Sequence, residues 1–225
     1  MIDSITVIFC LFFLCSYLRT STSLDSLSLN QFIKDGETLV SANGTFEMGF
    51  FSPGNSKGRY LGMWYKKLTP LTVLWVANRE TPVHNNSGVL KLNENGDLVV
   101  LNGENTMVWS SNISSNRVVV NNSITAKFLE TGNLVLKTGK GDIVWQSFDY
   151  PTDTLLPGMK LGWNFITGLN KKQTSWKSID DPAKGEYSSA IDPRGYPQAV
   201  ILKGSVIRLR IGSWNGRGMD IQHSH

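Results

Sequence analysis

The amino-acid sequence predicts an all-β protein whose sheets pack around a shared axis. A short Trp-centred stretch recurs as "VLWVANR", "MVWSSN" and "IVWQSF". The Trp residues of these stretches, Trp75, Trp109 and Trp145, are 34 and 36 residues apart. Alternating apolar and polar residues with Gly turns precede them, and no helical periodicity is seen. A period of about 35 residues is typical of repeat architectures.

The composition indicates a globular protein. Of the 225 residues, 18% are charged and 40% are hydrophobic, which excludes both a disordered chain and one wholly buried in membrane. The 21 Gly and 7 Trp residues favour short strands and many turns. The length allows one or two domains with their own cores. The formal net charge is +4, but the basic residues are scattered, so no nucleic-acid partner is expected.

The N-terminus has the features of a secretory signal peptide. Ile5–Leu18 is an uncharged apolar run of 14 residues, whereas a membrane-spanning helix needs about 20. Small and polar residues follow in Arg19–Ser23, so residues 1–23 are expected to be removed by cleavage near Ser23. No stable membrane span would then remain. An uncleaved anchor is the alternative, because Asp3 stands where signal peptides carry a basic residue.

Cysteine usage and glycosylation motifs fit export from the cell. Both cysteines, Cys10 and Cys15, lie in the apolar run, so the mature chain would contain no disulfide and no Cys-ligated metal. Such a chain must be stabilised by its hydrophobic core. Four Asn-x-Ser/Thr motifs predict N-glycosylation on exposed loops. They are at Asn43, Asn85, Asn112 and Asn121.

The second and third repeats follow one pattern. A Gly turn, Gly96 or Gly132, lies 13 residues before the Trp, and the strand after it carries apolar residues at i and i+2 on one face. One hairpin unit cannot bury that face, whereas three units around an axis can. The Trp residues would be the core anchors, because their large area dominates a core. An ordinary β-sandwich with Trp residues spaced by chance is the alternative.

The first repeat is less regular. It has the same turn at Asn43-Gly44, but its Trp75 follows 31 residues later. The surplus lies in Ser52–Pro70, which carries Pro, Gly and Asn. This composition predicts an insertion.

Longer motifs resemble a known family. The Trp repeat with "NGDLVVL" and "TGNLVLK" resembles the bulb-type (mannose-binding) lectin domain. That resemblance implies a β-prism of three four-stranded sheets with pseudo-threefold symmetry. Gly49–Val83 and Val144–Gly162 are similar to the extracellular regions of plant S-domain (G-type lectin) receptor-like kinases and S-locus glycoproteins. Gln173–Gly216 is similar to the start of a second lectin-like β module in that group.

The resemblance implies a domain order. We expect a signal peptide at 1–23, a lectin domain at 24–148, a linker at 149–162, a partial second module at 163–216 and a divergent tail at 217–225. An incomplete second module would leave strand edges uncovered, which predicts lower stability for it than for the first. A truncated gene product, a splice form and a soluble decoy are all compatible with this order.

The family's mannose pockets have the motif Gln-x-Asp-x-Asn-x-Val-x-Tyr, in which alternate side chains converge on one sugar. The second repeat keeps only the Val of this motif, and the third keeps Asn and Val. Each missing partner of a buried polar group costs on the order of 1–3 kcal/mol, so these sites are degenerate. The weak candidate sugar-binding residues are Asn93, Asn95, Asp97, Val99, Asn133 and Val135.

No enzymatic activity is predicted. His84 is the single histidine of the repeat region, and no nucleophile motif or kinase phosphate-binding loop accompanies it. His223 and His225 are too close together and too near the terminus to predict a metal site. No cofactor is expected.

Two functional hypotheses follow from the resemblance. The first is a secreted or cell-surface lectin-like module that binds mannose-type glycans through degenerate motifs. The second is a protein-interaction ectodomain that binds cell-surface or receptor proteins in cell recognition, pollen recognition or defence signalling. Both place the chain outside the cell, in the apoplast or at the cell surface, and both leave a dimer open.

Overall fold

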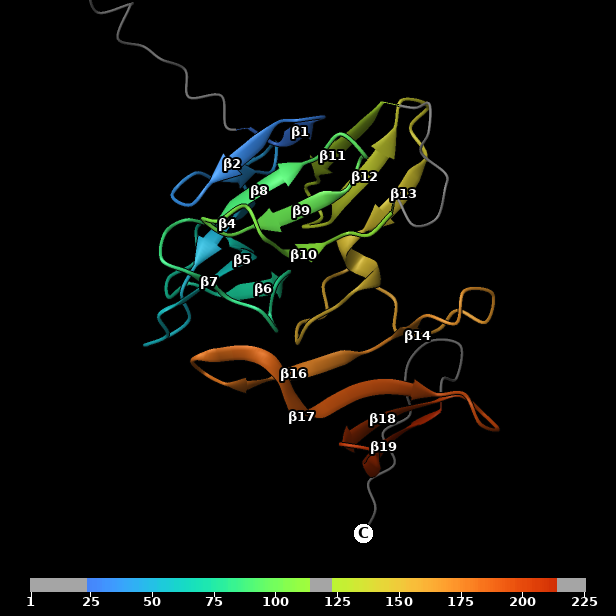
Figure 1. Cartoon of the computed structure of the whole chain (residues 1–225). Coiled ribbons are helices and arrows are strands. Elements are labelled where there is room, and N and C mark those ends of the chain that lie inside the picture. The colour runs from blue at the N-terminus through green and yellow to red at the C-terminus, as the bar shows by residue number, and fades with distance from the viewer. Residues whose placement is uncertain (1–23, 114–122, 214–225) are drawn as a thin grey trace, which may run out of the picture.

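The computed structural model describes residues 24–113 and 123–213, and these residues form an all-β structure (Figure 1). Three sheets pack around a common axis in the upper part of Figure 1, and a fourth sheet lies below them. The predicted all-β prism is therefore confirmed. The three upper sheets are referred to here as the prism.

Each sheet of the prism has four main strands. The first contains β3 (Leu39–Val40), β4 (Phe46–Phe51), β5 (Gly58–Tyr65) and β6 (Val73–Val76), and β7 (Val83–His84) pairs with β5. The second contains β2 (Phe32–Lys34), β8 (Val89–Leu92), β9 (Leu98–Leu101) and β10 (Met107–Ser110). The third contains β1 (Ser26–Ser28), β11 (Ile124–Phe128), β12 (Leu134–Thr138) and β13 (Ile143–Gln146).

The three sheets obtain their fourth strand in different ways. The second and third repeats each supply three strands, and the N-terminal strands β2 and β1 complete their sheets by pairing with β8 and β11. The first repeat has no such partner. Its insertion supplies β5, which lies between β4 and β6 and is mostly buried. The surplus of Ser52–Pro70 thus contains a core strand, flanked by two loops.

The same turn opens each repeat. The N–H of Gly44, Gly96 and Gly132 donates to the carbonyl three residues earlier, at 2.7, 3.1 and 3.0 Å. These glycines have φ values of 73°, 83° and 78°, a left-handed conformation that costs a glycine little. The Gly turns read from the sequence therefore fix the hairpin geometry of all three sheets.

The three Trp residues meet on the axis. Trp75, Trp109 and Trp145 pack edge to face, with ring centroids 5.9–6.4 Å apart and interplanar angles of 70–82°. Trp75 is 2% exposed and Trp145 is 6% exposed. Edge-to-face packing is favourable because the positive edge of one ring meets the negative face of the next. One Trp from each sheet thus closes the centre of the prism.

The segment after β13 continues into the prism core. Phe148 of the short 3-10 turn η2 (Ser147–Asp149) joins the main core cluster, as do Leu156 and Met159 of the stretch that follows the turn. The expected linker is therefore packed on the prism at these positions. The boundaries of the domain order remain a prediction.

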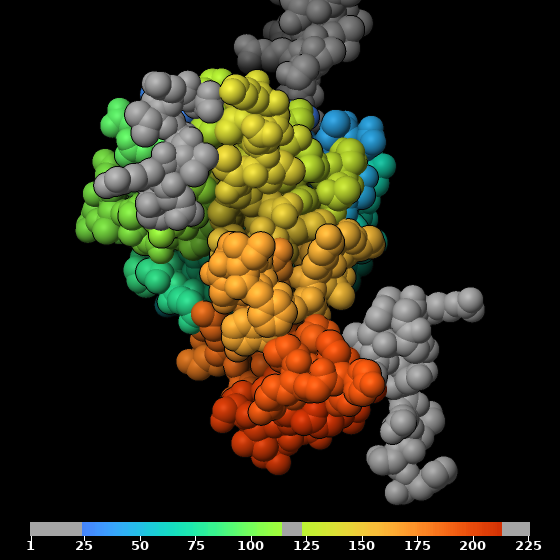
Figure 2. Space-filling view, turned by 90° about the vertical axis from the view of Figure 1, so that its right-hand side faces the viewer, coloured from blue at the N-terminus to red at the C-terminus, as the bar shows by residue number. Residues whose placement is uncertain are grey.

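The fourth sheet contains β16 (Gln173–Ser178), β17 (Asp181–Asp192), β18 (Gln198–Lys203) and β19 (Val206–Ser213), paired in that order. A small hairpin of β14 (Gly162–Trp163) and β15 (Asn170–Lys171) precedes it. Figure 2 shows this sheet, in orange and red, seated against one end of the prism. Few of its apolar side chains are buried; Pro182, Ala190 and Val200 are the buried ones in the part that the structure describes.

Candidate functional site

The predicted sugar-binding residue of the second repeat, Asp97, is turned into the structure. It is 5% exposed, and its Oδ1 accepts hydrogen bonds from the Ile113 N–H at 2.6 Å and the Ser111 hydroxyl at 3.5 Å. The Ser111 hydroxyl in turn accepts from the Leu98 N–H at 3.0 Å. The carboxylate thus ties β9 to the chain that follows β10.

Asn133 plays the equivalent part in the third repeat. It is 7% exposed, and its Oδ1 accepts from the Ser147 hydroxyl at 3.2 Å and the Phe148 N–H at 3.3 Å. Its Nδ2 donates to Gln146 Oε1 at 2.9 Å. Ser147 also accepts from the Leu134 N–H at 3.0 Å. The same network therefore occurs in two repeats.

The other candidate residues do not gather into a pocket. Val99 and Val135 are 4% and 0% exposed. The Asn93 Oδ1 accepts from the N–H groups of Asn95 and Asp97, which closes the hairpin turn. Asn95 is exposed on that turn. The structure thus places these side chains on turns and in buried pairs.

Sequence reasoning missed the role of the residue two positions after the Trp. Ser111 and Ser147 occupy this position. Each hydroxyl accepts a hydrogen bond from a strand N–H and donates one to the motif residue of its repeat, Asp97 or Asn133. The first repeat has Ala77 at this position. The repeated Trp-x-Ser was the signal that could have identified the network.

Replacing Asp97 with Ala is expected to lower the free energy of unfolding by about 1–3 kcal/mol, because the buried Ile113 N–H loses its acceptor. Asp97→Asn keeps an oxygen acceptor and should retain most of that stability. Asn95→Ala, on the exposed turn, should change stability by less than about 0.5 kcal/mol. Urea unfolding of the three variants measures these differences, and equal losses for the Asp97 and Asn95 variants would contradict the internal role.

The glycosylation motifs lie at accessible positions where the structure describes them. Asn43, Asn85 and Asn112 are exposed, and the latter two have φ values of 63° and 54°. Asn121 lies outside the described residues. Glycosylation at all four motifs remains a prediction.

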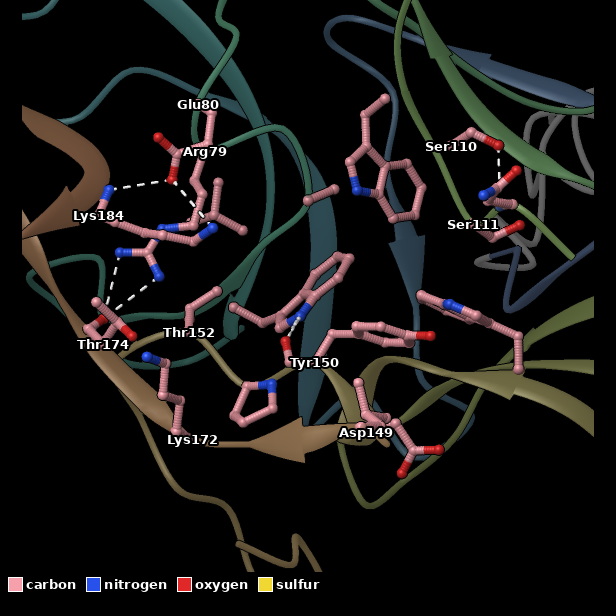
Figure 3. Close-up of a pocket in the computed structure, with 18 of the residues that line it drawn as sticks. Arg79, Glu80, Ser110, Ser111, Asp149, Tyr150, Thr152, Lys172, Thr174 and Lys184 are labelled. Carbon is pink, nitrogen blue, oxygen red and sulfur yellow. Dashed lines mark hydrogen bonds and ion pairs between the residues drawn. The ribbon is translucent and has the colours of Figure 1, made fainter. Parts of the chain in front are cut away.

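A cavity of about 730 Å³ lies where the fourth sheet meets the end of the prism (Figure 3). All three central Trp residues line it, together with side chains from the segment after β13 and from β15 to β17. Tyr150 lies in the middle of this view, stacked on Trp145 with centroids 5.7 Å apart and an interplanar angle of 15°. Its backbone carbonyl accepts a 2.8 Å hydrogen bond from Trp75 Nε1.

Arg79 joins the prism side of the cavity to the fourth sheet through hydrogen bonds. The buried guanidinium donates to the carbonyls of Pro182 at 2.6 Å, Ser175 at 2.9 Å and Thr174 at 3.2 Å. Burial lowers the pKa of Arg79 from its usual value, and the nearby Asp153 opposes this change. Arginine stays protonated at physiological pH despite such a shift, so the contact is a cation with carbonyl acceptors.

Charged groups around the cavity are largely paired. Glu80 lies 3.9 Å from the Lys184 ammonium, and Asp149 forms an ion pair with Lys171. Burial raises the pKa of Tyr150, and the negative charge of Asp149 raises it further. The Tyr150 hydroxyl therefore stays neutral at physiological pH.

Other kinds of site have little support among the described residues. Residues 24–113 and 123–213 contain no group of three or more His, Cys, Asp or Glu side chains placed to hold a metal ion. Within the same ranges no helix is long and apolar enough to cross a membrane. His84 is exposed at the end of β7, and no nucleophilic side chain of the described residues forms a hydrogen bond with its imidazole.

Comparison with known proteins identifies a lectin domain and a group of relatives. Residues 72–177 match the D-mannose binding lectin family. A putative G-type lectin S-receptor-like serine/threonine-protein kinase of Arabidopsis thaliana is 42% identical over 90% of this chain and 24% of its own length. The S-locus-specific glycoprotein S6 of Brassica oleracea is 41% identical over 93% of this chain and 48% of its own length. The chain thus spans a quarter to a half of these relatives.

Solved structures similar to this chain include mannose-binding lectins. The mannose-specific agglutinin of snowdrop (Galanthus nivalis), solved with methyl-α-D-mannoside, is 20% identical, with 61% of this chain and 99% of that chain covered and a TM-score of 0.38. A monomeric mannose-binding lectin of Gastrodia elata is 17% identical, with 55% and 96% covered and a TM-score of 0.42. By its sequence matches, the chain contains a D-mannose binding lectin domain, and its relatives are G-type lectin S-receptor-like kinases and S-locus glycoproteins.

Proposed function

We propose that this chain is an extracellular lectin-like recognition module that recognises its target without the mannose pockets of the family's strands. One observation carries this proposal. The motif side chains Asp97 and Asn133 are buried, and both hydrogen-bond to backbone and Ser groups inside their own repeat. A side chain held in this way has little capacity left for a sugar hydroxyl.

The energetics support the loss of mannose binding on the strands. A millimolar monosaccharide complex is worth only about 4 kcal/mol. Each hydrogen-bonding partner that the pocket lacks costs on the order of 1–3 kcal/mol. The second and third repeats carry Leu101 and Lys137 at the Tyr position and Asn93 and Leu129 at the Gln position. Two or three such losses are enough to remove the whole affinity.

The extracellular location has support in the sequence and the structure. The apolar N-terminal run predicts secretion, and three of the glycosylation motifs lie on exposed positions of the described chain. The relatives include S-locus-specific glycoproteins and receptor-like kinases, by their names. We therefore place this module in the apoplast or at the cell surface.

A protein partner is the second candidate target. The fourth sheet exposes large apolar side chains, including Tyr187 at 48%, Leu209 at 55% and Tyr196 at 84%. These side chains lie on β17, on the turn between β17 and β18, and on β19, and large exposed apolar groups are typical of interaction surfaces. Such a surface fits an ectodomain that binds another cell-surface or receptor protein.

Calorimetric titration with methyl-α-D-mannoside tests the proposed loss of the strand pockets. We expect no binding with a dissociation constant below about 10 mM, and no difference between the wild-type chain and Asn95→Ala. Snowdrop agglutinin is the positive control. Saturable binding that Asn95→Ala abolishes would show a working pocket in the second repeat and overturn this part of the proposal.

A further inference from the structure

We infer that the cavity between the prism and the fourth sheet binds a neutral pyranose sugar. This inference rests on the proposed function, because recognition of a glycan without the strand pockets requires a site elsewhere. The volume of about 730 Å³ lies within the range of about 300–1,000 Å³ usual for ligand sites. The central Trp residues of all three sheets line the cavity, and none of the six candidate sugar-binding residues of the strand motifs lines it.

An aromatic platform forms one part of the cavity. Tyr150 stacks on Trp145 through one ring face, yet the residue is 47% exposed, so the rest of its ring is open to solvent. Trp109 is only partly buried and also lines the cavity. The negative face of an aromatic ring attracts the positively polarised C–H groups that a pyranose presents on its flat side. This platform therefore suits a sugar ring.

Hydrogen-bonding groups surround the platform. Thr152, Asn170, Lys172 and Thr174 line the cavity. The Asn170 Oδ1 is buried, and no donor among the described residues reaches it. Buried acceptors are normally paired, so this oxygen lacks a donor, which a ligand hydroxyl at the Asn170 side chain would supply. The lining thus combines an apolar ring face with several groups that can pair hydroxyls.

The charges of the cavity favour a neutral ligand. Its two carboxylates, Glu80 and Asp149, each have a lysine partner, and the Arg79 guanidinium is occupied by four carbonyls. A cationic ligand would have to compete with the two lysines for these carboxylates. Lys172 also lines the cavity and has no ion pair among the described residues, so its ammonium can donate to a ligand oxygen. A neutral hexose or N-acetylhexosamine needs only hydrogen bonds and the aromatic face.

Two sources could supply this sugar. Asn112, which lies in a predicted glycosylation motif, is one of the residues that line the cavity. A glycan on Asn112 could place its own first sugars there, or a glycan from another molecule could enter. Both sources offer the same ring chemistry, and removal of the glycosylation motif at Asn112 distinguishes between the two sources.

The test uses the secreted, glycosylated chain and its Asn112→Gln variant. Mannotriose, chitotriose and cellotriose are titrated while the intrinsic Trp fluorescence is followed, because Trp109 and Trp145 line the cavity. We expect a saturable change with at least one of the three. Tyr150→Ala should weaken this binding about tenfold or more, whereas Tyr150→Phe, which keeps the ring, should stay within about twofold. Tyr196→Ala, at an exposed Tyr outside the cavity, is the matched control.

Each outcome decides the inference. Binding in both glycoforms that Tyr150→Ala weakens supports a glycan from another molecule, and binding only in Asn112→Gln supports occupation by the protein's own glycan. No binding in either form, or binding that Tyr150→Ala leaves unchanged while circular dichroism shows a folded chain, overturns the inference. Mannotriose binding abolished by Asn95→Ala would instead overturn the proposed loss of the strand pockets, whatever the Tyr150 variants do.

Discussion

Replacing Trp75 with Ala is expected to lower the free energy of unfolding of the prism by about 3–5 kcal/mol. The side chain is 2% exposed, contacts both other central Trp rings, and donates its indole N–H to the Tyr150 carbonyl. The substitution opens a cavity on the axis that no neighbouring side chain can fill without moving a sheet. Because native domains are stable by only about 5–15 kcal/mol, this loss removes a large fraction of the stability of the prism.

Urea unfolding followed by far-ultraviolet circular dichroism measures the effect. Trp163→Ala is the matched control, because Trp163 is 45% exposed on the short strand β14. It should change the free energy of unfolding by less than about 0.5 kcal/mol. Similar losses for the two variants would mean that the central Trp cluster does not stabilise the prism.

Replacing Arg79 with Ala is expected to release the fourth sheet from the prism. The buried guanidinium donates to four carbonyls of the segments that form β16 and β17. Hydrogen bonds to a charged group are worth about 1.5–3 kcal/mol each, and buried carbonyls left without a donor add a further cost. Trp176 adds an apolar contact, because it packs on the prism cluster of Phe51, Tyr60, Trp64 and Val76. We expect the prism to remain folded while residues 173–213 become accessible.

Limited proteolysis with mass-spectrometric mapping detects this release. In Arg79→Ala, cleavage within 173–213 should become at least about tenfold faster, with little change within 24–113. Arg79→Lys keeps the charge but not the forked geometry, and should give an intermediate rate. Arg208→Ala, at an exposed arginine of β19, is the control. Equal rates in wild type and Arg79→Ala would show that other contacts fix the sheet.

The same contact bears on the candidate sugar site. Arg79 and Thr174 both line the cavity and also join the prism to the fourth sheet. Docking of the sheet therefore forms the cavity, and a ligand bound there would stabilise the docked state by mass action. A sugar that binds at the Tyr150 platform should accordingly slow proteolysis within 173–213.

The sequence by itself determined the repeat and its main anchors. Tight Gly turns, alternating strands and an equally spaced Trp predict three hairpin units, because each of these signals acts over a few neighbouring residues. Turns at Gly44, Gly96 and Gly132 have the predicted left-handed conformation. The degeneracy of the sugar motifs could also be predicted from the sequence, because alternate residues on a strand share a face in any fold.

Only the tertiary structure decided which strands complete each sheet and which polar groups are still available to bind a ligand. Strands β1 and β2 pair with segments that lie far away in the sequence, and β5 enters the first sheet from an insertion. Asp97 and Asn133 look like sugar ligands in the sequence, yet their hydrogen bonds go to Ser and backbone groups some 14 to 16 residues later. Pairings of this kind depend on the distances that packing sets between separate segments, and no local pattern encodes them. The cavity exists for the same reason, because its walls come from the prism and from a sheet that Arg79 and other contacts between distant segments hold in place.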